Sequence, residues 1–340
     1  MGVKIGDLIS PRVVELKQLS GKKIAIDGLI SLYQFLSIIR GVDGQPLKDH
    51  QGRVTSHLAG LFYRTINLIE EGIRPVYVFD GQPPKLKAET LRERSEHRAE
   101  AKKQWELALA EDRLEDARVY AQASATVDQT IVQDAKALLT AMNVPWVQAK
   151  GEGEAQAAYM ARKGDAWAAG SQDFDALLFG APRMVRNLTI TGRRKLPRKE
   201  EYREIKPEVI ELAAVLQKLE VTSEQLIDIG ILVGTDYHPG VKGVGPKTAL
   251  RVIKEYGTLE KALKVGGFEV EMAFEAIRAI FQDVKQHVNS NYTLTWAKPD
   301  RDQVMEFLVE EHTFSQKRVE KALGRAEKML GQASLDSWFS

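Results

Sequence analysis

The chain has 340 residues, 44% of them hydrophobic, so it is long enough for one large or two modest domains with a substantial core. Its 48 basic and 47 acidic side chains nearly cancel, so a surface for nucleic acid can arise only by segregation of charge. The absence of cysteine excludes disulfides, thiolate zinc sites and cysteine nucleophiles, and no apolar run reaches the ~18 to 20 residues of a membrane span. We therefore expect a cytoplasmic protein that is a monomer and has no membrane contact.

Two short apolar runs in the N-terminal part each end in an aspartate. Residues 22–26 precede Asp27 and residues 75–79 precede Asp80, and each run reads as a buried strand. Between the two runs, apolar residues recur at helical spacing, so strands alternate with helices. This alternation predicts an α/β fold with a mostly parallel central sheet and helices on both faces.

Two pairs of acids follow the next candidate strands. Glu152 and Glu154 follow the apolar run at 144–147 and open an Ala-rich helix, and Asp173 and Asp175 follow a further run. Because right-handed crossovers bring the carboxyl ends of parallel strands to one edge, we expect these acids to lie beside the two aspartates above. Such carboxylates repel one another unless a cation lies among them, which predicts a divalent metal site. The alternative is that all of them only cap or open helices.

A polar, Ala-rich stretch without glycine or proline runs from residue 85 to residue 142 and predicts helices without a strand. Between residues 85 and 103 it carries seven Lys or Arg against four glutamates. The alternative to a functional role is a solvated helix with pairs such as Glu89 with Arg92 and Arg92 with Glu96. Since this helix departs from the rim of acids at Asp80, we favour contacts to phosphate groups.

Residues 184–204 resemble a β-hairpin with Thr191 and Gly192 in its turn. The basic residues beside the turn have a simpler explanation, which is that they solvate a sheet edge. After Lys206 and Pro207 we expect the chain to become helical.

A glycine-rich turn follows a candidate helix at 226–233. Gly243 and Gly245 expose backbone N–H groups, and Lys247 and Thr248 open the next helix, an arrangement that suits an anion. A P-loop is excluded because Pro246 separates Gly245 from Lys247 and because the turn follows a helix and not a strand. The segment predicts a helix-hairpin-helix-type element that holds a DNA backbone without reading bases.

The C-terminal part reads as helical at 258–288 and again at 307–330, where Gly324 weakens the pattern. The last residues, 331–340, are too few to bury much. Four of them would dock in a partner's pocket, namely Gln332, Leu335, Trp338 and Phe339. The alternative is a tail that folds back on its own core.

Five segments, in order along nearly the whole chain, resemble those of the flap endonucleases, structure-specific 5′ nucleases of DNA replication and repair. They are Val-Phe-Asp-Gly at 78–81, Gly-Glu-Gly-Glu-Ala at 151–155, Ser-Gln-Asp-Phe-Asp at 171–175, Gly-Thr-Asp-Tyr at 234–237 and Gly-Val-Gly-Pro-Lys at 243–247. The tail is similar to the motif by which these enzymes bind the sliding clamp. Because the chain stops directly after this motif, it looks archaeal.

The resemblance implies a nuclease core at 1–260 with a helical arch at about 84–130 and a helix-two-turn-helix at about 220–256. It further implies a C-terminal helical region of the same domain at 261–330 and a flexible clamp-binding tail at 331–340.

The resemblance also assigns roles to side chains. It implies seven metal ligands, namely Asp27, Asp80, Glu152, Glu154, Asp173, Asp175 and Asp236, the last of which our strand argument does not reach. Lys87 and Arg94 would contact the scissile phosphate, and Tyr33 would stack on the base beside it. Gly2 would lie near the site and the DNA.

Two details differ from the family pattern. Thr55 and Phe314 resemble part of a pocket for a 3′ single-nucleotide flap, but His312 stands where the family often has lysine. Gly28 stands where alanine is common after the first aspartate.

The chemistry implied is hydrolysis of DNA at flap junctions by two Mg²⁺ ions, with Mn²⁺ as an alternative metal and with 5′-3′ exonuclease activity. One rival is a non-catalytic DNA-binding clamp accessory, which would need the basic elements and the tail but not the acids. A second rival is an RNA-cleaving nuclease with the same acidic sheet.

Overall fold

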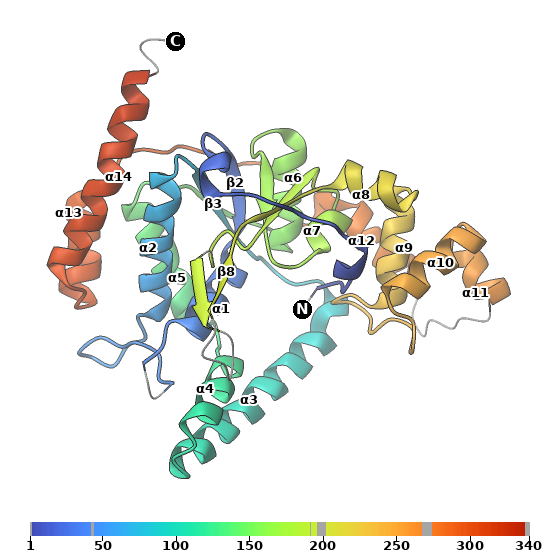
Figure 1. Ribbon diagram of the computed structural model, residues 1–340, viewed down its shortest axis with the longest axis horizontal. Coiled ribbons are helices and arrows are strands. Elements are labelled where there is room, and N and C mark those ends of the chain that lie inside the picture. The colour runs from blue at the N-terminus through green and yellow to red at the C-terminus, as the bar shows by residue number, and fades with distance from the viewer. Residues whose placement is uncertain (1, 42–43, 191, 196–201, 267–273, 337–340) are drawn as a thin grey trace.

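The computed structural model describes residues 2–41, 44–190, 192–195, 202–266 and 274–336. A seven-stranded sheet in the order β1-β9-β6-β5-β2-β3-β4 forms its centre (Figure 1). The parallel strands are β2 (Lys23–Asp27), β3 (Arg74–Phe79), β4 (Trp146–Gln148), β5 (Ala168–Gly170) and β6 (Arg183–Arg186), and the antiparallel ones are β9 (Glu208–Glu211) and β1 (Arg12–Val13). The predicted mostly parallel α/β sheet is confirmed.

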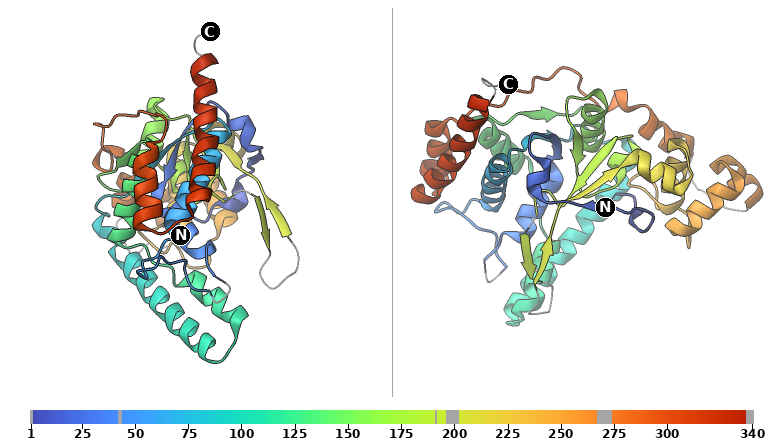
Figure 2. Two further views of the ribbon diagram at one scale, coloured as in Figure 1. Left: turned by 90° about the vertical axis from the view of Figure 1, so that its left-hand side faces the viewer. Right: turned by 45° about the horizontal axis from the view of Figure 1, so that its top comes forward.

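The central strands are apolar on both sides because each side faces a separate core. In β2, Ile24 and Ile26 pack into one core and Ala25 into the other. The first core is covered by α1 (Gly28–Ile38), α2 (Ser56–Glu70), α5 (Gln129–Ala141), α13 (Arg301–Met305) and α14 (Gln316–Asp336). The second is covered by α6 (Gly153–Lys163), α7 (Asp175–Leu178), α8 (Leu212–Leu219), α9 (Ser223–Val233) and α12 (Phe274–Gln282). Figure 2 shows the two sets of helices on opposite sides of the sheet.

A pair of helices projects from the sheet below the carboxyl ends of the strands (Figure 1). After the short 3-10 helix η3 (Lys85–Lys87), α3 (Ala88–Ala110) leads outward and α4 (Leu114–Ala123) returns. α3 is polar on nearly all sides and buries Ala108 against its neighbours. The surface pairs of Arg92 that belong to the alternative of a solvated helix are present, at 3.1 Å to Glu89 and 3.8 Å to Glu96. The helical insert without a strand is therefore confirmed, and we refer to η3, α3 and α4 as the arch.

The region after β6 corrects two expectations. A hairpin exists, but it is formed by β7 (Gly192–Lys195) and β8 (Tyr202–Ile205), so Gly192 begins a strand and is not part of the turn. Thr191 and the connection at 196–201 lie outside the described residues. The strand around Met184 belongs to the main sheet because it is buried between β5 and β9. The chain is also not helical directly after Pro207, since β9 intervenes before α8.

The remaining elements are mostly helical. They are η1 (Gly6–Leu8), η2 (Leu16–Leu19), α10 (Pro246–Tyr256), α11 (Leu259–Gly266), η4 (Val284–Gln286) and the π-helical turn η5 (Glu306–Glu311). α14 runs through Gly324 without a break, because Val319, Leu323 and Ala326 are buried on the same face. It includes the start of the predicted tail, at 331–336, whereas Trp338 and Phe339 lie outside the described residues. None of the helices in the described ranges is long and apolar enough to cross a membrane.

Candidate active site

The acids predicted to meet at one sheet edge do so. Asp27 is the last residue of β2, Asp80 follows β3, and Glu152 follows β4 as the N-cap of α6. A single cleft is lined by Asp27, Asp80, Glu152, Glu154, Asp173 and Asp236, together with Tyr33, Lys87 and Arg94. Asp175 is buried beside it, where its charge acts on Glu154. We call the seven acids the rim.

Backbone and hydroxyl donors hold the acids of the rim in place. The amide of Gly153 donates to Asp80 Oδ1 at 2.6 Å, and the amide of Val3 donates to Asp175 Oδ1 at 2.6 Å. The hydroxyl of Ser171 donates to Glu154 Oε1 at 2.7 Å. These bonds orient carboxylates that would otherwise turn away from one another.

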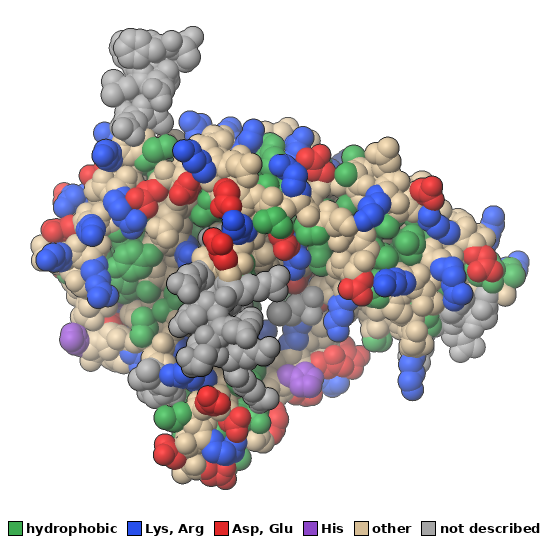
Figure 3. Space-filling model, viewed as in Figure 1, with side chains coloured by type: hydrophobic (Ala, Val, Ile, Leu, Met, Phe, Trp, Pro, Cys, Tyr) green, Lys and Arg blue, Asp and Glu red, His purple; other side chains and the backbone are tan. Residues whose placement is uncertain are grey.

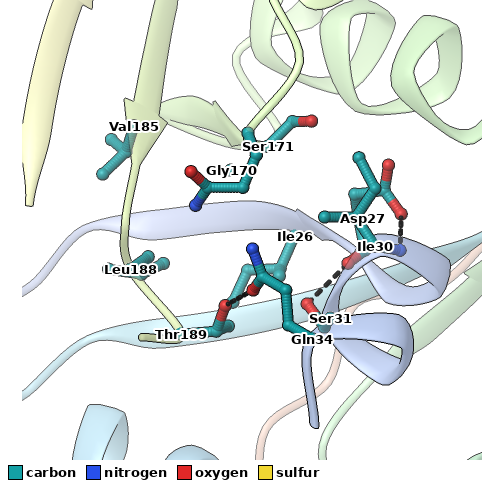
Figure 4. A pocket seen from close by; sticks show the side chains of 11 residues that line it. Ile26, Asp27, Ile30, Ser31, Gln34, Gly170, Ser171, Val185, Leu188 and Thr189 are labelled. Atoms are coloured by element: carbon teal, nitrogen blue, oxygen red, sulfur yellow. Dashed lines mark hydrogen bonds between the residues drawn. The ribbon is translucent and has the colours of Figure 1, made fainter. Parts of the chain in front are cut away.

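Asp27 lies at the N-terminus of α1, beside a small pocket (Figure 4). Its Oδ1 accepts from the amide of Ile30 at 2.8 Å, and its carbonyl accepts from the hydroxyl of Ser31 at 2.6 Å. Across the pocket, the hydroxyl of Thr189 lies 2.8 Å from Gln34 Oε1 and ties α1 to the segment after β6. Asp27 thus caps the N-terminus of α1, and the contact between Thr189 and Gln34 holds the same helix further along.

Burial and mutual repulsion raise the pKa of several carboxyls of the rim. Burial raises the pKa of Asp80 to about 6, with the charge of Glu152 acting in the same direction. Burial, reinforced by Asp236, raises the pKa of Asp175 to about 7. Burial also raises the pKa of Asp27 and Glu154, where neighbouring carboxylates add to the effect. The rim therefore favours protons or other cations at neutral pH.

Two cations of the arch enter the rim. Lys87 Nζ lies 2.5 Å from Glu152 Oε2 and 3.3 Å from Asp236 Oδ2, and Arg94 Nη2 donates to Asp236 Oδ1. Burial would lower the pKa of Lys87, but the charges of these acids outweigh burial and raise it. Burial would likewise raise the pKa of Asp236, but Lys87 and Arg94 outweigh it and the pKa is lowered. On the face shown in Figure 3, acidic and basic side chains are interspersed.

The donor set of the rim fits a divalent cation. Carboxylate oxygens are the ligands that hard cations such as Mg²⁺ prefer. The raised pKa values of Asp80 and Asp175 reflect burial and then repulsion by neighbouring carboxylates, and a metal would relieve the repulsion. Within the described part of the chain, however, no three acidic or histidine side chains converge closely enough to hold a metal as they stand. Lys87 pairs with Glu152 and Asp236, two of the acids whose oxygens a metal would need. Metal binding would require these ion pairs to loosen.

This electrostatic balance predicts how a metal changes stability with pH. Asp80 and Asp175 hold protons in the folded chain up to pH values of about 6 and about 7, well above their ordinary pKa of 3.8. Their protonation stabilises the fold fully below the ordinary pKa, and this stability is lost as pH rises through the folded values. A Mg²⁺ ion bound among these acids would replace the missing protons, so we expect saturating Mg²⁺ to raise the melting temperature by ~5 °C at about pH 7.5 and by much less at about pH 5. Differential scanning calorimetry with EDTA controls measures this, and an equal rise at both pH values would contradict it.

Two glycines let the backbone approach the rim closely. At Gly28 a Cβ atom would lie 2.8 Å from Phe79 Cε1 and 2.9 Å from the carbonyl oxygen of Val78, which explains why this chain has glycine there. Gly2 has φ of +56°, and a Cβ there would lie 2.7 Å from Cβ of Asp173. The amide of Gly2 donates to Asp236 Oδ1 at 3.1 Å, so the expected place of Gly2 beside the site is the observed one.

Of the side chains expected to contact DNA near the active site, one lies in the cleft and the others lie in or beside the core that α2 covers. Tyr33 lines the cleft, and the guanidinium of Arg98 lies 4.7 Å from its ring centroid. Thr55 is buried before α2, and Phe314 packs against the same core. His312 is only 4% exposed and lies 2.8 Å (Nδ1) from the carbonyl oxygen of Phe307, so it packs inside the fold.

The predicted turn between α9 and α10 leaves its backbone open. Gly243 has φ of +80°, and a Cβ at Gly243 or Gly245 would meet nothing within 4 Å. Lys247 is exposed in the first turn of α10, directly after Pro246, and Thr248 is half-buried beside it. Ion pairs that the sequence did not reveal hold the helices around this turn together, and we call them the brace.

In this brace Arg278 of α12 donates to Asp228 of α9 (Nη2 to Oδ1, 2.6 Å) and pairs with Glu260 of α11. These residues lie far apart in the sequence, and no local pattern connects them. The expected contacts of Gly243, Gly245, Lys247 and Thr248 with DNA stay predictions.

Comparisons with known proteins agree with this geometry. Family models for the XPG N-terminal domain and the XPG I-region match residues 1–101 and 143–236. The chain is similar to a flap endonuclease 1 of Aeropyrum pernix, with 54% identity over 100% of both chains. It is similar to the solved structure of flap endonuclease-1 from Methanococcus jannaschii, with 42% identity, a TM-score of 0.76 and coverage of 98% of this chain and 100% of that one. The catalytic core of Rad2 in complex with DNA substrate is 26% identical, with a TM-score of 0.66 and coverage of 95% and 97%.

Proposed function

The chain belongs to the flap endonuclease family, and we propose that it hydrolyses DNA at the junction of a 5′ flap with a duplex, with 5′-3′ exonuclease activity at the same site. The observation that carries this proposal is the rim of buried and half-buried, mutually repelling acids, which Lys87 and Arg94 of the arch enter. A protein that only bound DNA would lose stability through such acids and gain nothing from them.

We assign the metal role to the seven acids of the rim. When two Mg²⁺ or Mn²⁺ ions are bound there, they supply hydroxide at neutral pH and neutralise charge on the phosphate and the leaving oxygen. Lys87 and Arg94 would exchange Glu152 and Asp236 for oxygens of the scissile phosphate, which orients the phosphate and adds positive charge where negative charge develops. Tyr33, at the wall of the same cleft, would stack on the neighbouring base.

The test is cleavage of a labelled 5′-flap DNA with Mg²⁺, beside single-stranded DNA and an RNA flap on the same duplex. We expect a product cut at the flap junction, none with EDTA, and slow cleavage of single strands. Binding without cleavage would indicate a clamp accessory, and equal or faster cleavage of the RNA flap would indicate an RNA nuclease.

The turn between α9 and α10 would hold the duplex through its backbone. Lys247→Ala removes one exposed cation at the start of α10. We expect weaker binding to flapped and unflapped duplexes alike, with the slope of log K against log salt reduced by about one unit. Fluorescence anisotropy over a salt series measures both quantities, and a loss confined to flapped DNA would instead place Lys247 at the junction.

We propose the following organisation of the chain: a nuclease core at 1–260, a C-terminal helical region of the same domain at 261–330, and a clamp-binding tail at 331–340, in a monomer. Gln332 would hydrogen-bond in a polar pocket of the clamp, and Leu335, Trp338 and Phe339 would form one apolar face.

Replacing Trp338 and Phe339 together by alanine is expected to abolish stimulation of cleavage by a sliding clamp, because aromatic anchors at such interfaces contribute ~2 kcal/mol or more each. Cleavage without the clamp should be unchanged. A lower melting temperature and lower basal cleavage would mean that the tail packs on its own core.

A further inference from the structure

A lysine outside the rim, Lys136, is held in place by aromatic rings and a hydrogen bond. Lys136 of α5 lies between two aromatic rings, with Nζ 5.3 Å from the ring centroid of Phe79 and 4.9 Å from that of Trp146. Its Nζ donates to Oε1 of Gln148, at the end of β4, at 2.6 Å. The same turn of α5 holds Trp146, since Thr140 Oγ1 accepts from the indole N–H at 3.1 Å. Lys136 is therefore placed by its surroundings and is not a freely solvated cation.

The amide of Gln148 connects this lysine to the rim. Its Nε2 donates to the carbonyl oxygen of Asp80 at 2.6 Å, with longer contacts to the carbonyl oxygens of Phe79 at 3.2 Å and Ala149 at 3.3 Å. A lysine can only donate, so the amide oxygen must face Lys136 and the amide nitrogen must face the carbonyl groups. Lys136 on one side and these carbonyl groups on the other thus fix which way the amide points.

Asp80 needs such support because it lies just beyond the regular sheet. Around it the chain continues pairing outside β3 and β4, with the amide of Ala149 donating to Phe79 O at 2.9 Å and the amide of Gly81 donating to Gly151 O at 2.7 Å. The carbonyl of Asp80 receives its bond from the side chain of Gln148, while its carboxylate receives the amide of Gly153 at 2.6 Å. Backbone and side chain of Asp80 are therefore oriented by separate donors.

We propose that Lys136 and Gln148 are positioning residues that orient Asp80 for metal binding, an inference that rests on the metal role of the rim proposed above. Neither side chain needs to touch metal or DNA. Residues that orient a metal ligand without touching the metal contribute to metal affinity. Their loss commonly weakens metal binding by roughly 10- to 100-fold.

The test measures metal binding directly, by isothermal titration of the full chain with Mn²⁺ in the absence of DNA. Gln148→Met removes the donor to Asp80 and the acceptor of Lys136, so we expect Mn²⁺ affinity to fall by roughly 10- to 100-fold. Lys136→Met keeps an apolar stem against the rings and removes one of the contacts that hold the amide, so we expect a smaller loss. The double variant should match Gln148→Met, because the two residues act through one contact.

Lys23→Met is the matched control. Lys23 is also a half-buried lysine over an aromatic ring, 5.6 Å from the ring centroid of Trp296, but it lies at the opposite end of β2 from the rim. The Mn²⁺ affinity of the Lys23→Met variant should equal that of the wild type. In the Lys136 and Gln148 variants, the Mg²⁺ concentration for half-maximal cleavage should rise in parallel with the Mn²⁺ dissociation constant, and flap-DNA affinity without metal should stay unchanged.

Wild-type Mn²⁺ affinity in Gln148→Met would overturn the inference and leave the nuclease assignment intact. The inference would also be overturned if the loss of Mn²⁺ affinity in the three single variants simply followed the drop in their melting temperatures. That pattern would indicate general destabilisation. A wild-type chain that neither binds Mn²⁺ nor cuts flap DNA would overturn the proposed function and this inference together.

Discussion

Asp175→Asn is expected to lower the rate of 5′-flap cleavage by at least ~10³-fold, since a metal ligand commonly contributes several kcal/mol of transition-state stabilisation and each 1.36 kcal/mol is about tenfold in rate. Asp175 is buried at the first residue of α7, and its carboxylate acts electrostatically on Glu154. Asparagine keeps an oxygen for the amide of Val3, which now lies 2.6 Å from Oδ1. The local fold should therefore survive the change.

The same variant should bind flap DNA as the wild type does, because Asp175 lies behind the cations that would meet phosphate. It should also melt at a higher temperature without metal, since a neutral amide replaces a carboxyl whose pKa is raised to about 7 by burial and by Asp236. Single-turnover cleavage, anisotropy and calorimetry separate these effects. Cleavage near the wild-type rate in Mg²⁺ would remove Asp175 from the metal site.

Much of the site could be predicted because its chemistry follows strand ends. Asp27 and Asp80 terminate apolar runs, and topology alone brings such residues to one edge of a parallel sheet. Asp236 follows a helix, so only the resemblance to a family indicated it. The pairing of Lys87 with Glu152 was also beyond local reasoning, because it depends on how the arch folds back over the cleft.

The parts of the fold that were predicted wrongly are short or lack a local signal. β9 has few residues, and Val209 and Ile210 face different cores, so the strand reads as neither an amphipathic strand nor a helix. The hairpin turn was placed at the first glycine after Met184, whereas that glycine begins β7. In both places tertiary pairing determines the structure, and sequence periodicity carries little information.

Lys87→Met should lower cleavage by roughly 10² to 10³-fold, the usual loss when one donor to a developing charge is removed. Lys87 is 9% exposed and contacts Glu152 and Asp236, so its positive charge now stabilises these two carboxylates. In the proposed reaction it would stabilise the negative charge of the phosphate. Lys87→Arg keeps the charge but changes its geometry, so we expect an intermediate rate.

Metal binding by Lys87→Met should change in the opposite direction to cleavage. Without Lys87, Glu152 and Asp236 lose a competing cation, so Mn²⁺ affinity measured without DNA should rise. Asp175→Asn should instead lower both cleavage and Mn²⁺ affinity, because it removes a ligand. The two variants thus distinguish a metal ligand from a counter-charge by the sign of one measurement. If Lys87→Met also binds Mn²⁺ more weakly, the lysine assembles the rim for metal, and its proposed exchange of carboxylate for phosphate is wrong.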